Sequence, residues 1–132
     1  MKIHHICIQT SDYKTSLQFY TKGLGFQLVQ ESENFHGRDY NTWLTLDGFM
    51  IELQTAKEEK PFAPYNKNSE GIPHFCLFSE DFDADYQRIK ASDLASFRQK
   101  NHQDIYEVEQ GRLFKVRAPE GTIVEVRDGV EL

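Results

Sequence analysis

The sequence predicts an α+β fold built from two βαβββ modules whose strands form a cupped mixed sheet. The first observation is a repeat, because residues 3–12 and 73–81 each contain an apolar run, a histidine and, seven positions later, an aspartate. His5 and His74 lie 69 positions apart, and this offset also aligns apolar residues beyond the aspartates. The second observation is a hairpin pattern at the end of each half. We expect one domain, with module one at 1–56, a linker at 57–72 and module two at 73–132.

Module one begins with a predicted strand over residues 2–10, which is rich in isoleucine. Because successive side chains of a strand point to opposite faces, His5 shares a face with Cys7 and Gln9. His4 is expected on the other face together with Ile6. The two neighbouring histidines therefore do not form a single motif.

A helix is predicted to follow this strand. Ser11 or Asp12 can cap its first turn, and apolar residues then recur at helical spacing as far as Leu24. Gly23 and Gly25 are placed to end the helix, and a strand is expected over residues 26–30.

The last two strands of module one form the clearest hairpin. Residues 40–46 and 49–55 flank Asp47-Gly48, a dipeptide typical of a type I′ turn. With a two-residue loop, paired positions sum to 95, so Trp43 lies opposite Glu52. A carboxylate in an apolar strand is costly unless a cation or hydrogen-bond donor meets it, so Glu52 is a candidate functional residue.

Module two repeats this plan after a linker rich in proline and polar residues. A strand is predicted over 73–79, a helix over 81–92, a short strand near 95–98, a turn at 101–104 and a strand from 105. The closing hairpin has strands 112–117 and 122–127 around a four-residue turn at 118–121. That turn makes paired positions sum to 239, which predicts Phe114 opposite Glu125, as Trp43 is opposite Glu52.

Composition limits the classes of partner. The net charge of -6 and the pI near 5.3 argue against nucleic acid and anionic membranes, which both select basic surfaces. No apolar run approaches the roughly 20 residues that span a bilayer, and the first residues lack a signal-peptide pattern, so we expect a cytoplasmic protein. Cys7 and Cys76 are too few for a disulfide framework and are expected to be buried thiols.

Two imidazoles and two carboxylates at matching positions of a repeat form a donor set suited to one divalent ion, Zn, Ni, Co, Mn or Fe(II), with coordination positions left open. Such an ion polarises a bound carbonyl group. The predicted ligands are His5, Glu52, His74 and Glu125. Three other interpretations remain open: core histidines, glutamates in rim ion pairs, and a Cys₂His₂ zinc site that includes Cys7 and Cys76.

The ordered motifs resemble the vicinal oxygen chelate superfamily, which contains glyoxalase I, extradiol dioxygenases, and fosfomycin- and bleomycin-resistance proteins. The resemblance is carried by residues 5–12, 19–26, 50–53, 74–78 and 118–126, and only residues 93–110 match poorly. Because both Glu52 and Glu125 are present, the ligand set looks most like the metal quartet of glyoxalase I. Bacterial glyoxalase I has an arginine and an asparagine where this chain has Gln9 and Ala56, so the resemblance supports the metal site more strongly than glutathione as substrate.

The resemblance implies a divalent-metal-dependent lyase or isomerase of glyoxalase I type, with a small carbonyl substrate, a homodimer, and Glu52 or Glu125 as the base. Extradiol dioxygenase, antibiotic-modifying thiol transferase and non-catalytic small-molecule binding protein are the alternatives. The expected substrate contacts are aromatic, amide and cationic side chains near the four ligands, namely Gln9, Trp43, Phe114 and Arg127.

Overall fold

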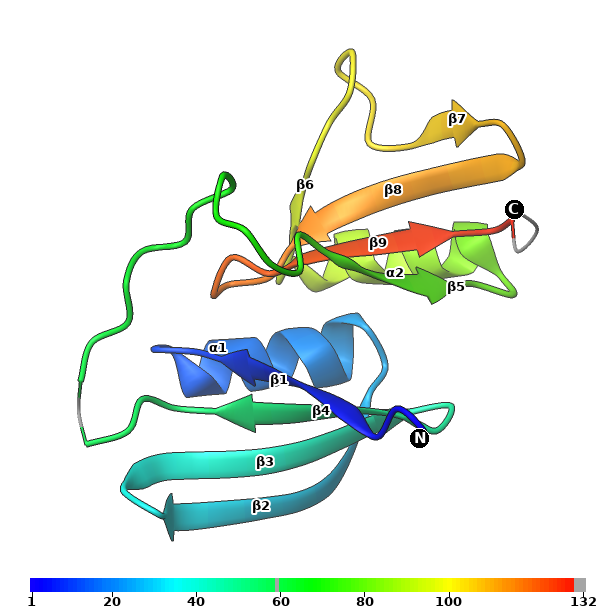
Figure 1. The fold of residues 1–132 in the computed structure, drawn as a ribbon. Helices are drawn as coiled ribbons and strands as arrows, with labels where there is room; N and C mark the ends of the chain where they lie inside the picture. The colour runs from blue at the N-terminus through cyan, green and yellow to red at the C-terminus, as the bar shows by residue number, and fades with distance from the viewer. Residues whose placement is uncertain (59, 130–132) are drawn as a thin grey trace. The chain divides into compact units, whose positions relative to one another are not determined.

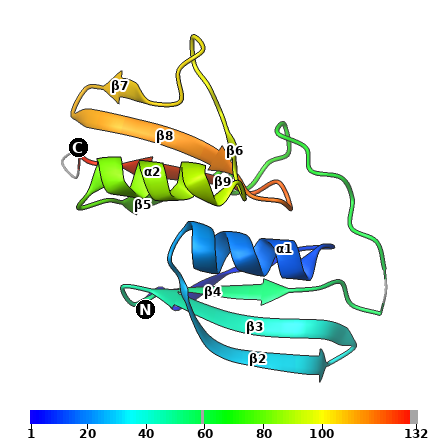
Figure 2. The same ribbon diagram turned by 180° about the vertical axis from the view of Figure 1, so that it is seen from behind.

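The computed structural model describes residues 1–58 and 60–129, which cluster into two compact units, residues 1–65 and 66–132 (Figure 1). Glu59 of the predicted linker and residues 130–132 of the predicted second module lie outside the described residues. Each unit has its own mixed sheet, and a helix covers one face of that sheet, as the view from behind also shows (Figure 2). The predicted α+β class is confirmed. In the described part of the chain, no helix is long and apolar enough to cross a membrane.

The first unit has the predicted βαβββ order. Its elements are β1 (His5–Gln9), α1 (Tyr13–Gln18), β2 (Gln27–Phe35), β3 (Arg38–Leu46) and β4 (Phe49–Gln54). The strands are ordered β1-β4-β3-β2, with β1 parallel to β4 and the other pairs antiparallel. The first and last strands of the unit are therefore neighbours.

The helix of the first unit begins at its predicted cap, because the Asp12 carboxylate accepts a hydrogen bond from the Thr15 backbone N–H at 3.3 Å. It does not continue as an α-helix to Leu24. One π-helical turn, η1 (Phe19–Gly23), follows α1 and is closed by the Leu24 N–H donating to the Phe19 carbonyl at 3.0 Å. Within this wider turn, the adjacent aromatic residues Phe19 and Tyr20 are both fully buried.

The hairpin of β3 and β4 confirms the predicted register. Asp47 and Gly48 both have positive φ, at 47° and 78°, as a type I′ turn requires. Trp43 is paired with Glu52. The neighbours of Glu52 on β4, Ile51 and Leu53, point to the opposite face and are fully buried.

The second unit repeats the arrangement with one additional short strand. Its elements are β5 (Phe75–Phe78), α2 (Phe82–Ser92), β6 (Ser96–Phe97), β7 (Tyr106–Val108), β8 (Gly111–Arg117) and β9 (Ile123–Arg127). The strand order is β5-β9-β8-β6, β7 pairs with β8, and β5 is parallel to β9. Asp81 caps α2 by accepting from the Ala84 N–H at 3.2 Å, as Asp12 caps α1.

The predicted register of the last hairpin is wrong by one residue. Glu125 is paired with Lys115, and Phe114 with Val126. Gly121 has a φ of 102°, and its N–H donates to the Ala118 carbonyl at 2.9 Å. The loop of this hairpin therefore has three residues instead of the predicted four.

This shift moves Phe114 to the opposite face of the sheet. Phe114 is fully buried and its ring lies 5.2 Å from Phe82 of α2, with Tyr86 and Phe97 also in ring contact. The expectation that Phe114 contacts a substrate is therefore wrong. Lys115 takes the position beside Glu125 that the sequence pattern assigned to Phe114.

Candidate functional site

The first unit brings one histidine and one glutamate together on the face of its sheet away from α1. Because β1 runs parallel to β4, Cys7 is the residue paired with Glu52, and His5 precedes it by two positions on the same face. His5 Nε2 lies 3.5 Å from Glu52 Oε2. The Glu52 side chain is 17% exposed and that of His5 34%, so the pair is partly shielded but reachable.

Two aromatic rings position His5. The Trp43 ring meets the His5 ring edge to face, with 4.9 Å between centroids. His4 Nδ1 lies 2.8 Å from His5 Nδ1, so a hydrogen bond between these atoms leaves His5 Nε2 directed at Glu52. A hydrogen bond at the second ring nitrogen orients the imidazole of a metal-binding histidine.

The expectation that His4 faces away from this group is wrong, because its ring contacts both His5 and Trp43. The strand begins only at His5, so the alternation of a strand does not constrain His4. The sequence signal that could have identified it is the adjacent pair of histidines itself.

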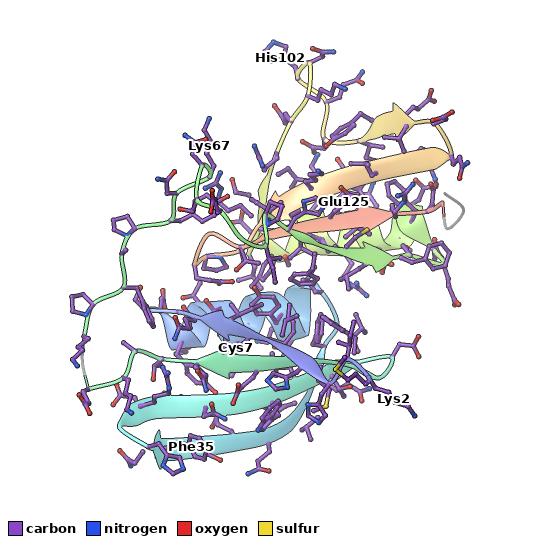
Figure 3. All side chains as sticks on the ribbon, viewed as in Figure 1. Lys2, Cys7, Phe35, Lys67, His102 and Glu125 are labelled. Carbon is purple, nitrogen blue, oxygen red and sulfur yellow. The ribbon has the colours of Figure 1, made fainter. Side chains whose placement is uncertain are left out.

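The second unit repeats the histidine–glutamate pair at the equivalent positions. Cys76 is paired with Glu125 across the parallel strands β5 and β9, and His74 Nε2 lies 3.8 Å from Glu125 Oε2. The Glu125 side chain is only 10% exposed. Figure 3 labels Cys7 on β1 and Glu125 on β9, the strands that carry one member of each pair.

Glu125 also contacts a lysine and a cysteine. Lys115 Nζ lies 3.0 Å from its Oε2 atom, and the Cys76 thiol donates to Oε1 at 3.5 Å. Burial by itself would raise the pKa of the Glu125 carboxyl, but Lys115, Cys76 and His74 together lower it below its usual range. Glu125 is thus an ionised carboxylate that is paired with the Lys115 ammonium group.

The cysteines were expected to be buried, and this is wrong, because both are exposed. They lie on the sheet face that the helices do not cover, beside Glu52 and Glu125. Partial burial and the Glu125 carboxylate raise the pKa of Cys76 to about 11, and partial burial and Glu52 also raise that of Cys7. The neighbouring carboxylates thus favour the protonated form of both thiols in the metal-free protein.

The remaining predicted contacts divide between the units. Gln9 pairs with Gln54 on the His5 side of the first sheet. Arg127 pairs with Phe78 on the Glu125 side of the second sheet, and its Nε atom is buried without a hydrogen-bond partner among the described residues. Within the described residues of either unit, no three side chains of the His, Cys, Asp and Glu types gather closely enough to hold a metal.

Each pair nevertheless fits a divalent metal as two adjacent ligands. Nitrogen and oxygen ligands about 2.1 Å from one metal lie roughly 3.0–3.4 Å from each other. The observed separations of 3.5 Å and 3.8 Å need only small side-chain adjustments to reach this range. Imidazole with carboxylate also suits Zn, Mn, Fe, Co and Ni.

Comparison with known proteins identifies the family of the chain. Residues 2–126 match the Glyoxalase/Bleomycin resistance protein/Dioxygenase superfamily. The chain belongs to this superfamily. Over 52 residues it is 46% identical to the uncharacterized protein YwkD of Bacillus subtilis. The matched stretch makes up 39% of this chain and 41% of that protein. The matched stretch thus spans less than half the length of that relative.

Solved structures of superfamily proteins have the same fold at low sequence identity. A glyoxalase family protein from Bacillus cereus is 15% identical with a TM-score of 0.77, covering 99% of this chain and 95% of that one. A mutant of the fosfomycin resistance protein FosX from Listeria monocytogenes, complexed with Mn(II) and 1S,2S-dihydroxypropylphosphonic acid, is 17% identical with a TM-score of 0.74, covering 98% and 92%. TnmS3, an antibiotic binding protein from Streptomyces sp. CB03234, is 15% identical with a TM-score of 0.66, covering 98% of each chain.

Proposed function

We propose that this superfamily member is a divalent-metal-dependent lyase or isomerase of glyoxalase I type, which moves a proton next to the carbonyl group of a small substrate. The single observation that supports the proposal is the repeated pair, His5 with Glu52 and His74 with Glu125, at equivalent positions of the two units. In this proposal each pair supplies two ligands to a divalent metal. When bound, the metal supplies Lewis acidity that makes the carbon–hydrogen bond beside a carbonyl more acidic.

The two glutamates differ in how well they suit the role of base. Glu125 is held by Lys115 and Cys76, which lower the pKa of its carboxyl in the metal-free protein. Glu52 carries the ion-pair contact with His5 and no contact with a lysine or arginine among the described residues. We therefore assign proton transfer to Glu52, from the carbon beside the carbonyl to a neighbouring carbon. We assign to Glu125 only the role of metal ligand.

Metal content tests the ligand assignment directly. Elemental analysis after dialysis against Zn²⁺ or Ni²⁺ should show stoichiometric metal in the unmodified protein and a loss in both His5→Ala and His74→Ala. The matched control is His102→Ala, which changes an exposed loop histidine and should keep full metal content. Full metal content in either ligand variant would refute the assignment.

A second experiment separates metal binding from proton transfer. In D₂O, exchange of the hydrogens beside the carbonyl of hydroxyacetone or pyruvate can be followed by NMR with the metal-loaded protein. Glu52→Gln should abolish the exchange while metal is retained through the remaining ligands. Stoichiometric iron with oxygen uptake on a catechol would instead identify an extradiol dioxygenase.

The second candidate function is binding of a small molecule without a metal. It is favoured by Lys115, whose ammonium group neutralises the Glu125 carboxylate. In that case a Glu52→Gln/His74→Ala double variant would bind the same ligand as the unmodified protein. Loss of metal, exchange and ligand binding together in this variant would exclude it.

A further inference from the structure

The sheet face that carries Glu125 has a defined set of neighbours. Paired positions on β5, β9 and β8 form rows of side chains on this face. One row contains Cys76, Glu125 and Lys115, and the next row along contains Phe78, Arg127 and Leu113.

This face is rich in cations although the chain is acidic overall. Lys115, Arg117 and Arg127 alternate along β8 and β9 on the Glu125 side. On the neighbouring strand β6, Ser96 pairs with Arg117, and just after this strand the Arg98 backbone N–H donates to the Lys115 carbonyl at 2.8 Å. On this side of the sheet, the paired positions of β8 and β9 thus contain three cations and one carboxylate, in a chain with a net charge of -6.

The equivalent face of the first unit differs in charge. Its rows across β1, β4 and β3 are neutral at every position except Glu52, which is flanked by Cys7 and Trp43. The other members of these rows are Gln9, Gln54, Asn41, His5, Met50 and Thr45. The two faces therefore share the histidine, cysteine and glutamate but differ in the residues around them. The second face has more cationic side chains at its paired positions, which favours an anion.

Lys115 and a bound metal would compete for the same carboxylate oxygen of Glu125. Its Nζ atom lies 3.0 Å from Oε2, the same oxygen that faces His74 Nε2. If Oε2 ligates a metal, the ammonium loses its counterion and stands beside a divalent cation, which is unfavourable. A second anion bound on this face would give the Lys115 ammonium group a new counterion.

Arg127 is placed to share such an anion. It is the diagonal neighbour of Lys115 across β9 and β8, and diagonal neighbours are roughly 7–8 Å apart at Cα, within reach of long side chains. Its Nε atom is buried and lacks a hydrogen-bond partner among the described residues. A guanidinium group binds carboxylates and phosphates through two parallel hydrogen bonds.

We propose that Lys115 and Arg127 bind an anionic group of the substrate, a carboxylate or a phosphate-type group, on this face of the second unit. This inference rests on the proposed function and narrows its substrate class to small carbonyl compounds that carry an anion. In the metal-bound protein, the Lys115 ammonium group pairs with the substrate anion instead of with Glu125. Metal and anion then strengthen each other's binding.

Titration calorimetry with metal-free, chelator-treated protein tests the anion site independently of the metal, with methylphosphonate and acetate as probes. Glu125→Gln frees Lys115 without a metal and should strengthen anion binding about tenfold, since a charge-assisted hydrogen bond becomes available. Lys115→Gln and Arg127→Gln should each weaken it about tenfold, and Lys115→Arg should restore it. Arg88→Gln, which removes the same charge from α2 where Arg88 pairs with Asp85, is the control and should have no effect. Preference for one probe identifies the substrate anion as carboxylate or phosphate-type.

The outcomes separate this inference from the proposed function. Equal anion affinity in all five variants, or absence of anion binding both with and without Zn²⁺, would overturn the anion site even if the metal binds. Anion binding that depends on Lys115 and Arg127 would support the site even if no metal binds, and would then count against the lyase. A further supporting result is tighter methylphosphonate binding in the Zn²⁺-loaded protein than in the metal-free protein.

Discussion

Replacing Lys115 with methionine removes the ammonium group beside Glu125 and keeps an unbranched side chain of similar bulk. The two charges are 3.0 Å apart, which corresponds to an attraction of about 5 kcal/mol at an effective dielectric constant of about 20. A quarter of the Lys115 side chain is exposed (25%), so solvent screening reduces the net contribution. We expect the free energy of unfolding of the metal-free protein to fall by about 1–3 kcal/mol.

Metal binding should change in the opposite direction. A metal about 2.1 Å from Glu125 Oε2 would lie no more than about 5 Å from Lys115 Nζ in its present position. Even at the dielectric constant of water, a monovalent and a divalent cation at about 5 Å repel by about 1.7 kcal/mol. Lys115→Met should therefore bind Zn²⁺ or Mn²⁺ at least tenfold more tightly in a buffer without coordinating anions.

Urea unfolding of the metal-free protein and calorimetric metal titration measure the two effects separately. Arg88→Met is the control, because it removes a cation of the same unit that lies on α2. Metal affinity that stays the same or weakens in a folded Lys115→Met protein would refute the view that Lys115 and the metal compete for one carboxylate oxygen.

Three further predictions concern single side chains. Phe114→Ala should lower the free energy of unfolding by about 3–5 kcal/mol in urea denaturation, because the ring is fully buried against α2. Hydrogen bonds from Gln99, Lys90 and Tyr86 lower the pKa of Asp104 despite its burial. The stability that Asp104 contributes is therefore present above its pKa in the unfolded chain, about 3.9, and is lost as the pH falls through its lower pKa in the folded protein. Urea midpoints between pH 2 and 6 should accordingly fall less steeply in Asp104→Asn. His4→Ala should weaken metal binding about tenfold in calorimetry while metal stoichiometry is unchanged, because it removes the hydrogen bond that orients His5.

The sequence was sufficient for the fold class and for the first hairpin because local chemistry decides both. Asp47-Gly48 adopts positive φ at two successive residues with ease, which leaves one favourable loop length and therefore one register. Trp43 and Glu52 consequently pair as predicted. The repeat of capped helices and histidine-bearing strands likewise depends on residues close together in sequence.

The second hairpin shows where such reasoning fails. The segment at 118–121 is compatible with loops of three or four residues, and the choice depends on whether Gly121 closes the turn or lies inside it. One residue of difference exchanges Phe114 for Lys115 beside Glu125. The prediction therefore missed the most strongly charged contact of the candidate site.

The pairing of first and last strands within each unit has a consequence for the site. Because β1 adjoins β4 and β5 adjoins β9, each unit by itself contains a complete histidine–glutamate pair. Two identical copies of one unit would supply the same four donor groups as the present chain. The side chain paired with the glutamate can therefore differ between the units without loss of the pair, and it is Trp43 in one unit and Lys115 in the other.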